Sequence, residues 1–320
     1  MSKEVMMALG AGVMSAAASM AFLIGLPGAL LFAYLAPMPL LLAGFSMGNK
    51  AANIAAGSGL IAAGFIAGLP GAGLFGAFHA LPAWFTIRLA LTRTPGVGDK
   101  SETGAGDWYP GGWILCWLSV MAAVALLTLA VSSFGGGTGM SEAVSQYLGQ
   151  VLGAMMPDMP EDLRQSMVAG LSPLFPGLIG VSWAMMTVLN GIAALALLRR
   201  WGIVPRPVPA LKNLVLPPWA SWLWVIFIGA ALIGALLGAG NIEYMGRNLG
   251  VIMSVPFFFV GLGVAHGIIG RMPYAGFSYA VFYLLLLLFG WLAMAVAGVG
   301  LIDQWFGLRD RMSAANRNRE

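Results

Sequence analysis

The sequence predicts an all-α polytopic membrane protein, a helical bundle of about eight or nine transmembrane helices. Of its 320 residues, 59% are hydrophobic and only 9% are charged, against roughly a quarter charged in an average soluble domain. The few charged residues cluster between long uncharged runs, several of which exceed the ~20 apolar residues that a spanning helix needs. Hydrocarbon, and not water, must therefore surround most of these segments.

Nine hydrophobic segments are candidate spans. Their ranges are 5–24, 26–47, 50–69, 71–92, 111–133, 173–198, 219–239, 249–269 and 274–302. Short turns rich in glycine and proline join the first four, such as Leu69-Pro70-Gly71, so these connections leave no room for a soluble domain. We interpret the first segment as a retained span and not as a cleaved signal peptide, because further spans follow at once.

Three regions follow from this order of segments. Residues 1–200 form a front bundle of about six transmembrane helices, which includes an outer loop over 134–172. Residues 201–218 form a cytoplasmic linker that holds five prolines, Pro205, Pro207, Pro209, Pro217 and Pro218, and proline at this density stiffens a linker. Residues 219–320 form a back bundle of about three helices that ends in a basic tail.

Lysine and arginine in short loops indicate which side of the membrane is cytoplasmic. With nine spans, the cations after the second, fourth, sixth and eighth segments share one side with the N-terminus, which we therefore expect inside. These cations are Lys50, Arg88, Arg93, Lys100, Arg199, Arg200, Arg206, Lys212 and Arg271. The tail conflicts with this count, because Arg309 and Arg311 then fall outside. Either the tail breaks the charge rule, or a segment near Arg271 is re-entrant.

The outer loop carries an apolar stripe with helical spacing. Its members are Val144, Tyr147, Leu148, Val151, Leu152 and Met155, which recur every three or four residues, as on one face of an amphipathic helix. Pro157 ends this helix, and a second short helix follows Pro160. The pair either lies on the outer membrane surface or covers an outward-facing cavity as a lid.

Polar residues within the spans are candidates for substrate binding, because such groups are costly in a membrane. His79, Asn190 and His266 lie within predicted helices, while Glu243 and Arg247 lie on a short outer turn. For each helical residue the alternative is a hydrogen-bonded packing role, and for the turn it is a solvated loop. At the end of the chain, Asp303 and Arg309 lie in the headgroup region or pair with neighbours.

Small residues recur along the first segment at Ala8, Gly12 and Ser15. Such spacing lets two helices approach closely. The close contact is made either within the chain or with a helix of a separate membrane protein, so these three residues are candidates for partner-helix packing.

Several functional classes are not expected from this sequence. Two histidines and one cysteine, Cys116, leave no metal-ligand set and no serine–histidine–acid triad. A Walker sequence is absent, so any transport would need a separate ATPase. Gly71 to Gly76 match GxGxxG, but neither a preceding strand nor a following acid supports nucleotide binding. We therefore expect no enzyme, no cofactor and no nucleic-acid partner, but contact with the lipid bilayer.

Three stretches resemble the YybS-like family of bacterial multi-pass membrane proteins. They are APMPLLLAGFSMGNKAA over 36–52, FFFVGLGVAH over 257–266 and GLIDQWFGLR over 300–309, and the resemblance extends over essentially the whole chain. The sequence departs from the family pattern at Gly307, where an acidic or polar residue is usual. The resemblance implies a location in the bacterial inner (cytoplasmic) membrane.

That family is distantly similar to the S components of energy-coupling-factor vitamin transporters. The similarity implies an S-component-like bundle that binds a small molecule from outside, while separate coupling and ATPase subunits supply energy. Ala8, Gly12 and Ser15 occupy the place where S components contact their partner, although the alanine pattern differs. The same broad fold in MreD-like proteins implies the alternative role, a scaffold or assembly factor that binds another membrane protein.

Overall fold

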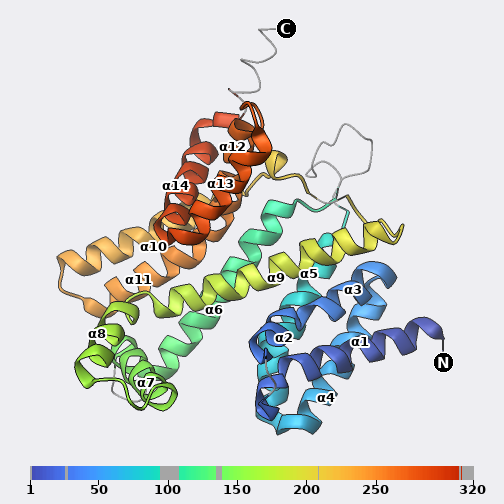
Figure 1. Ribbon diagram of the computed structural model, residues 1–320, viewed down its shortest axis with the longest axis horizontal. Coiled ribbons are helices and arrows are strands. Elements are labelled where there is room, and N and C mark those ends of the chain that lie inside the picture. Colours follow the sequence, from blue (N-terminus) through green and yellow to red (C-terminus); the bar gives the residue numbers. More distant parts are fainter. Residues whose placement is uncertain are drawn as a thin grey trace. The chain divides into compact units, whose positions relative to one another are not determined.

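The computed structural model describes residues 2–25, 28–93, 108–134, 139–207, 209–309 and 311. In these residues the regular structure is helical, and the β-type pairing is limited to one isolated antiparallel bridge between Arg93 and Trp108. The chain divides into two compact units: unit 1 comprises residues 1–114 and 183–210, and unit 2 comprises residues 115–182 and 211–320. The predicted all-α membrane bundle is thereby confirmed (Figure 1).

The number of spanning helices is lower than the eight or nine expected. Within the described residues, five helices are long and apolar enough, namely 29–47, 49–90, 111–131, 175–200 and 218–236, and two bent helix pairs raise the total to at most seven. Helix α1 (Lys3–Ser19) has 17 residues and is therefore only ~26 Å long, short of the ~30 Å hydrocarbon core. The helical run 49–90 is counted once in this total, although it folds back on itself and covers both expected spans, 50–69 and 71–92.

In unit 1, α1 is followed by η1 (Ala21–Ile24), α2 (Ala29–Leu35) and α3 (Pro37–Met47). The Ser2 hydroxyl caps α1 by accepting from the Val5 N–H at 3.3 Å. Ala36 keeps helical dihedral angles between α2 and α3, so the two form one span that matches the expected segment 26–47. Gly48, with φ of +84°, ends this span.

The next helical run folds back on itself at Gly68. It comprises α4 (Asn49–Phe75), η2 (Gly76–Ala80) and α5 (Leu81–Ala90). The Trp84 Nε1 donates to Asn53 Oδ1 at 2.7 Å, although residues 31 apart would be ~46 Å apart in a straight helix. Gly68 has a φ of +68°, a conformation that glycine adopts without strain. The run is thus a helical hairpin whose two legs match the expected segments 50–69 and 71–92.

The Pro-rich linker is anchored to unit 1 by Arg206, which is only 6% exposed. Its guanidinium donates to the Ala90 carbonyl at 3.0 Å and to the Tyr109 carbonyl at 3.3 Å. The first carbonyl is at the C-terminus of α5, where a cation is favoured by the helix dipole. Just after Tyr109, α6 (Gly111–Phe134) begins, and α9 (Phe175–Arg200) ends shortly before the linker.

In unit 2, the loop between α6 and α9 contains the two expected helices, α7 (Met140–Met155) and α8 (Glu161–Leu171). Val144 and Leu148 of the predicted stripe are buried, whereas Tyr147 and Met155 are exposed. The centre of the stripe therefore packs within the protein, and its two edges remain on the surface.

Glycines set the helix contacts in the rest of unit 2. Helix α10 (Pro218–Leu236) runs antiparallel to α11 (Gly240–Met253), with Gly246 against the backbone of Ala231. Helix α12 (Val255–Ile269) continues from α11 after a bend of 41°. It packs antiparallel to α14 (Gly290–Phe306), where Gly261 and Gly300 lie directly on the opposing backbone.

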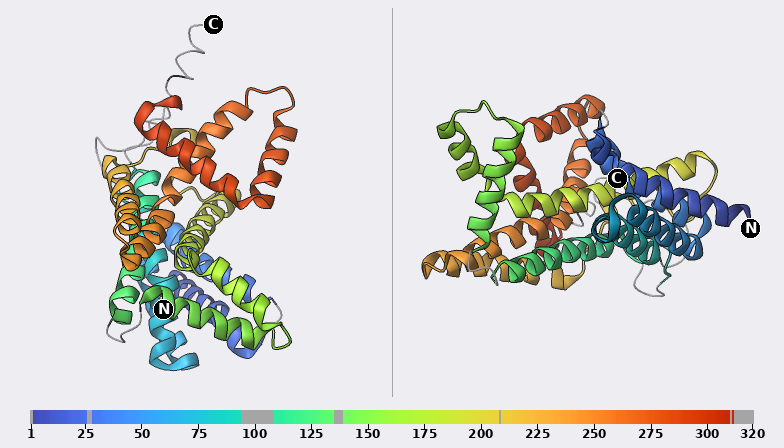
Figure 2. Two further views of the ribbon diagram at one scale, coloured as in Figure 1. Left: turned by 90° about the vertical axis from the view of Figure 1, so that its left-hand side faces the viewer. Right: turned by 90° about the horizontal axis from the view of Figure 1, so that it is seen from below.

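The expected span 274–302 is not one continuous helix, because the chain bends sharply within it. Helix α13 (Ala275–Leu288) meets α14 at an angle of 114° (Figure 2). Phe289 has extended dihedral angles, φ −118° and ψ 90°, and Gly290 has no side chain to oppose the turn. The last apolar segment is therefore a bent helix pair, which is either one broken span or a re-entrant loop.

Candidate functional site

His79 lies in the π-helical turn η2 of unit 1. Its Nδ1 atom is buried and has no hydrogen-bond partner among the described residues, and its ring lies 5.9 Å from that of Phe75. Short π-helical turns are rare in proteins, but those that occur are often found at functional sites. The Trp183 indole of α9 donates to the neighbouring Phe78 carbonyl at 2.8 Å, which fixes this turn against α9.

Asn190 lies on α9 two turns beyond Trp183, ~10.5 Å further along the helix axis. It is 5% exposed, and its Nδ2 donates to the Tyr34 carbonyl at 2.7 Å and to the Met186 carbonyl at 2.8 Å. Its Oδ1 is buried, and no donor in the described part of the chain reaches it. Unit 1 therefore contains two predicted site residues, each with one enclosed and unpaired polar atom.

Glu243 and Arg247 form an ion pair on α11 of unit 2. The Arg247 Nη1 lies 3.2 Å from Glu243 Oε1, and both side chains are 37% exposed. The guanidinium also lies 6.0 Å from the Tyr244 ring. The four-residue spacing places the two charges on one helix face, so each already has a partner.

Asn248 on the same helix is fully buried, and its role was not predicted from the sequence. Its Oδ1 accepts from the Gly177 N–H at 2.8 Å, and its Nδ2 donates to the Pro173 carbonyl at 3.0 Å. Gly177 is in the first turn of α9, where backbone N–H groups lack partners within the helix. Asn248 therefore caps α9 from α11. The only signal in the sequence was that Asn248 lies four residues after Tyr244, so the two share a helix face. The Tyr244 hydroxyl donates to the Ser172 carbonyl, close to the same end of α9.

His266 binds α13 to α12 in unit 2. Its Nε2 lies 2.7 Å from the Tyr283 hydroxyl, and its ring lies 4.8 Å from the Tyr279 ring. The Tyr279 hydroxyl donates to the His266 carbonyl at 3.1 Å. This arrangement matches the hydrogen-bonded packing role, the alternative that the sequence left open for His266.

Ala8, Gly12 and Ser15 are all buried inside unit 1. A Cβ at Gly12 would meet the Ala55 carbonyl oxygen and the Gly59 nitrogen of α4, and the Ser15 hydroxyl donates to the Ala36 carbonyl at 2.5 Å. The close packing that these small residues indicate is therefore made with α3 and α4 of the same chain.

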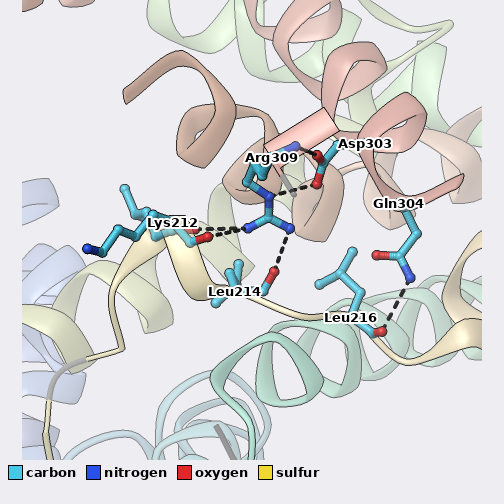
Figure 3. A network of polar contacts seen from close by, with 7 residues as sticks. Lys212, Leu214, Leu216, Asp303, Gln304 and Arg309 are labelled. Atoms are coloured by element: carbon cyan, nitrogen blue, oxygen red, sulfur yellow. Dashed lines mark hydrogen bonds and ion pairs between the residues drawn. The ribbon is translucent and has the colours of Figure 1, made fainter. Parts of the chain in front are cut away.

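A polar network at the end of unit 2 joins Arg309 to the linker (Figure 3). Arg309 donates from Nη1 to the Leu211 and Lys212 carbonyls, at 3.3 and 3.0 Å, and from Nη2 to the Leu214 carbonyl at 2.8 Å. Its Nε donates to the buried Asp303 carboxylate at 2.7 Å. Of the two alternatives for these charges, pairing with neighbours is the one observed.

Metal-binding side chains do not gather in the described residues, where no group of three or more His, Cys, Asp or Glu could hold an ion. Cys116 is a free, buried thiol of α6. The candidate residues thus fall into two sets, His79 and Asn190 in unit 1 and Glu243, Arg247 and His266 in unit 2. Among the described residues, His79 Nδ1 and Asn190 Oδ1 of the first set and Arg247 Nε of the second set are buried without a hydrogen-bond partner.

A family model described as "Predicted membrane protein (DUF2232)" matches residues 13–304, most of the chain. The chain belongs to this family. No curated protein and no solved structure matches it. Membership in the DUF2232 family agrees with the apolar helices described above and establishes a multi-pass membrane protein. All five candidate substrate-binding residues lie within the matched region.

Proposed function

We propose that this DUF2232 protein binds a small polar molecule as the substrate-binding component of a membrane transport system. It has no ATPase of its own and no enzymatic activity in this proposal, and it works in a bacterial inner membrane with its N-terminus in the cytoplasm. The resemblance to the S components of energy-coupling-factor transporters supports the same role, with a separate coupling protein as the partner.

The observation that carries the proposal is that two predicted site residues of unit 1 each have a buried polar atom without a partner among the described residues, Asn190 Oδ1 and His79 Nδ1. More than nine in ten buried polar groups in proteins have a hydrogen-bond partner, and an unsatisfied group is particularly costly in hydrocarbon. A ligand with an N–H or O–H donor would satisfy the Asn190 oxygen. The imidazole nitrogen would accept or donate according to its tautomer.

The alternative role, a scaffold that binds another membrane protein, is implied by the resemblance to MreD-like proteins, and the stripe of small residues was one of its motivations. Since Ala8, Gly12 and Ser15 are buried against α3 and α4, this stripe does not favour it. Stable copurification with a second membrane protein, in the absence of any small-molecule ligand, would favour the scaffold.

The test is thermal stabilisation of the purified full chain by a library of small polar metabolites. A ligand at a hundredfold excess over its Kd stabilises a folded protein by about 2.7 kcal/mol, which raises Tm measurably. We expect the shift to disappear in His79→Phe, which keeps a ring beside Phe75, and in Asn190→Leu.

The matched control is Asn53→Leu, which also removes a side-chain hydrogen bond in unit 1, that to Trp84, but removes no unpaired atom. It should retain the ligand-dependent shift even if its own Tm falls. The proposal is wrong if no metabolite stabilises the wild-type protein, or if all three variants respond to the ligand as the wild type does.

A further inference from the structure

The basic side chains of unit 1 gather at one end of its helices. The described residues of this unit contain seven basic side chains and one acidic side chain, Glu4. We call the seven the basic end; they are Lys3, Lys50, Arg88, Arg93, Arg199, Arg200 and Arg206. The excess of positive charge is local, because the whole chain has a net charge of only +4.

Contacts between the helices bring these residues to the same end. The Ser58 hydroxyl donates to the Leu9 carbonyl, and a Cβ at Gly71, just after the hairpin turn, would meet Met20. Thus α1 and the first leg of α4 run in parallel, so Lys3 and Lys50 begin at the same level. The Trp84–Asn53 hydrogen bond then brings the end of α5 back to that level.

The linker also keeps the C-terminus of α9 near the C-terminus of α5. Arg206 donates to the Ala90 carbonyl, which is the last residue of α5. Arg200 is six residues before Arg206, and six residues span at most ~21 Å. Arg199, Arg200 and Trp201 are all exposed here.

Tryptophans accompany the arginines of the basic end. The Arg88 guanidinium lies 4.9 Å from the Trp84 ring, and that of Arg93 lies 4.7 Å from the Trp108 ring. Tryptophan favours the headgroup level of a bilayer, and stacking on a ring orients a guanidinium. Because helices long and apolar enough to cross a membrane end here, we expect these arginines at the level of the lipid phosphates.

We propose that the basic end of unit 1 is a binding surface for anionic phospholipids. Arg88, Arg93, Arg199 and Arg200 contact the headgroup phosphates, and Trp84, Trp108 and Trp201 contact the upper part of the acyl chains. A guanidinium forms two parallel hydrogen bonds with phosphate, and basic side chains outnumber acidic ones by seven to one in the described residues of this unit. This inference is independent of the proposed substrate.

The test is native mass spectrometry of the full chain in a mild detergent, titrated with phosphatidylglycerol or with phosphatidylcholine of the same acyl chains. We expect several-fold tighter retention of phosphatidylglycerol. Replacing both exposed arginines after α9, Arg199→Gln with Arg200→Gln, should weaken this retention by roughly fivefold for each cation removed. Size-exclusion profiles verify that the variant is folded.

The matched control is the double variant Arg164→Gln with Arg271→Gln, which removes the same charge from unit 2 and should retain the lipid preference. Equal retention of the two lipids by the wild type, or equal losses in both double variants, would overturn the proposal. Displacement of phosphatidylglycerol by millimolar inorganic phosphate would identify a free anion as the ligand. Retention of a soluble acidic protein without a lipid preference would also contradict the proposal.

Discussion

The carboxylate of Asp303 binds Arg309 twice, through the backbone and through the side chain. Its Oδ1 accepts from the Arg309 backbone N–H at 2.8 Å, and its Oδ2 accepts from Nε at 2.7 Å. The chain reaches this geometry because Gly307, with φ of +61°, reverses it just after α14. The glycine at this position is therefore explained by the backbone conformation.

Replacing Asp303 with asparagine should destabilise the protein strongly. The substitution leaves a largely buried arginine without its counter-ion, and breaking a buried pair in this way costs roughly 3–5 kcal/mol. Arg309 keeps its contacts with the linker carbonyls, so we expect the lower end of that range. The measurement is the unfolding temperature in detergent. Asp158→Asn, an exposed aspartate of unit 2, is the control and should change Tm little; equal Tm values for the two variants would contradict the prediction.

The start of the tail and the linker should lie on the same side of the membrane. Groups in hydrogen-bond contact share one depth in the bilayer, and Arg309 contacts the carbonyls of 211–214. The re-entrant alternative is thus favoured, with the turn at Phe289 and not near Arg271. This arrangement removes the conflict between the basic tail and the charge rule.

Labelling of single engineered cysteines tests whether the linker and the start of the tail lie on the same side of the membrane. The native Cys116 is fully buried, so it contributes little background to labelling by a membrane-impermeant maleimide. We expect Lys212→Cys and Arg311→Cys to react from the cytoplasmic side, and Gln150→Cys on α7 to react from the opposite side. If Lys212→Cys and Arg311→Cys react from opposite sides, the returning α13–α14 pair is incorrect.

Two glycines of α1 should respond in opposite ways to alanine. A methyl group at Gly12 would collide with the backbone of α4, whereas one at Gly10 would meet nothing within 4 Å. Gly12→Ala should therefore cost roughly 1–3 kcal/mol through overpacking. Gly10→Ala should be neutral or stabilising by up to about 1 kcal/mol, because alanine favours helix. Comparison of the two unfolding temperatures tests the contact, and a similar Tm for both variants would show that α1 is not packed on α4 in this way.

The local features of the fold were predictable from the sequence, and the long-range ones were not. The turn at Gly68 lies beside Leu69-Pro70-Gly71, a strong turn signal, and Pro157 marks the end of α7. The break at Phe289 lies inside a continuous apolar run, where hydropathy cannot distinguish a straight span from a returning pair. The shorter span count has the same origin, since composition does not reveal where a helix ends inside a membrane.

The same division between local and long-range features applies to the candidate residues. The spacing of Glu243 and Arg247 indicates that they share a helix face, and the structure pairs them. His266 depends on Tyr279 and Tyr283 of the next helix, a contact that no spacing rule supplies. Arg206 was interpreted only as a topology signal, because its carbonyl partner at Ala90 is 116 residues away in the sequence.

The cap that Asn248 provides for α9 has a consequence for biosynthesis. The Gly177 N–H and the Asn248 side chain are 71 residues apart, and chains emerge from the ribosome N-terminus first, at about 5–20 residues per second. The first turn of α9 therefore exists for several seconds before its acceptor is made. During that interval the helix entrance is incomplete, so α9 reaches its final stability only after α11 has entered the membrane.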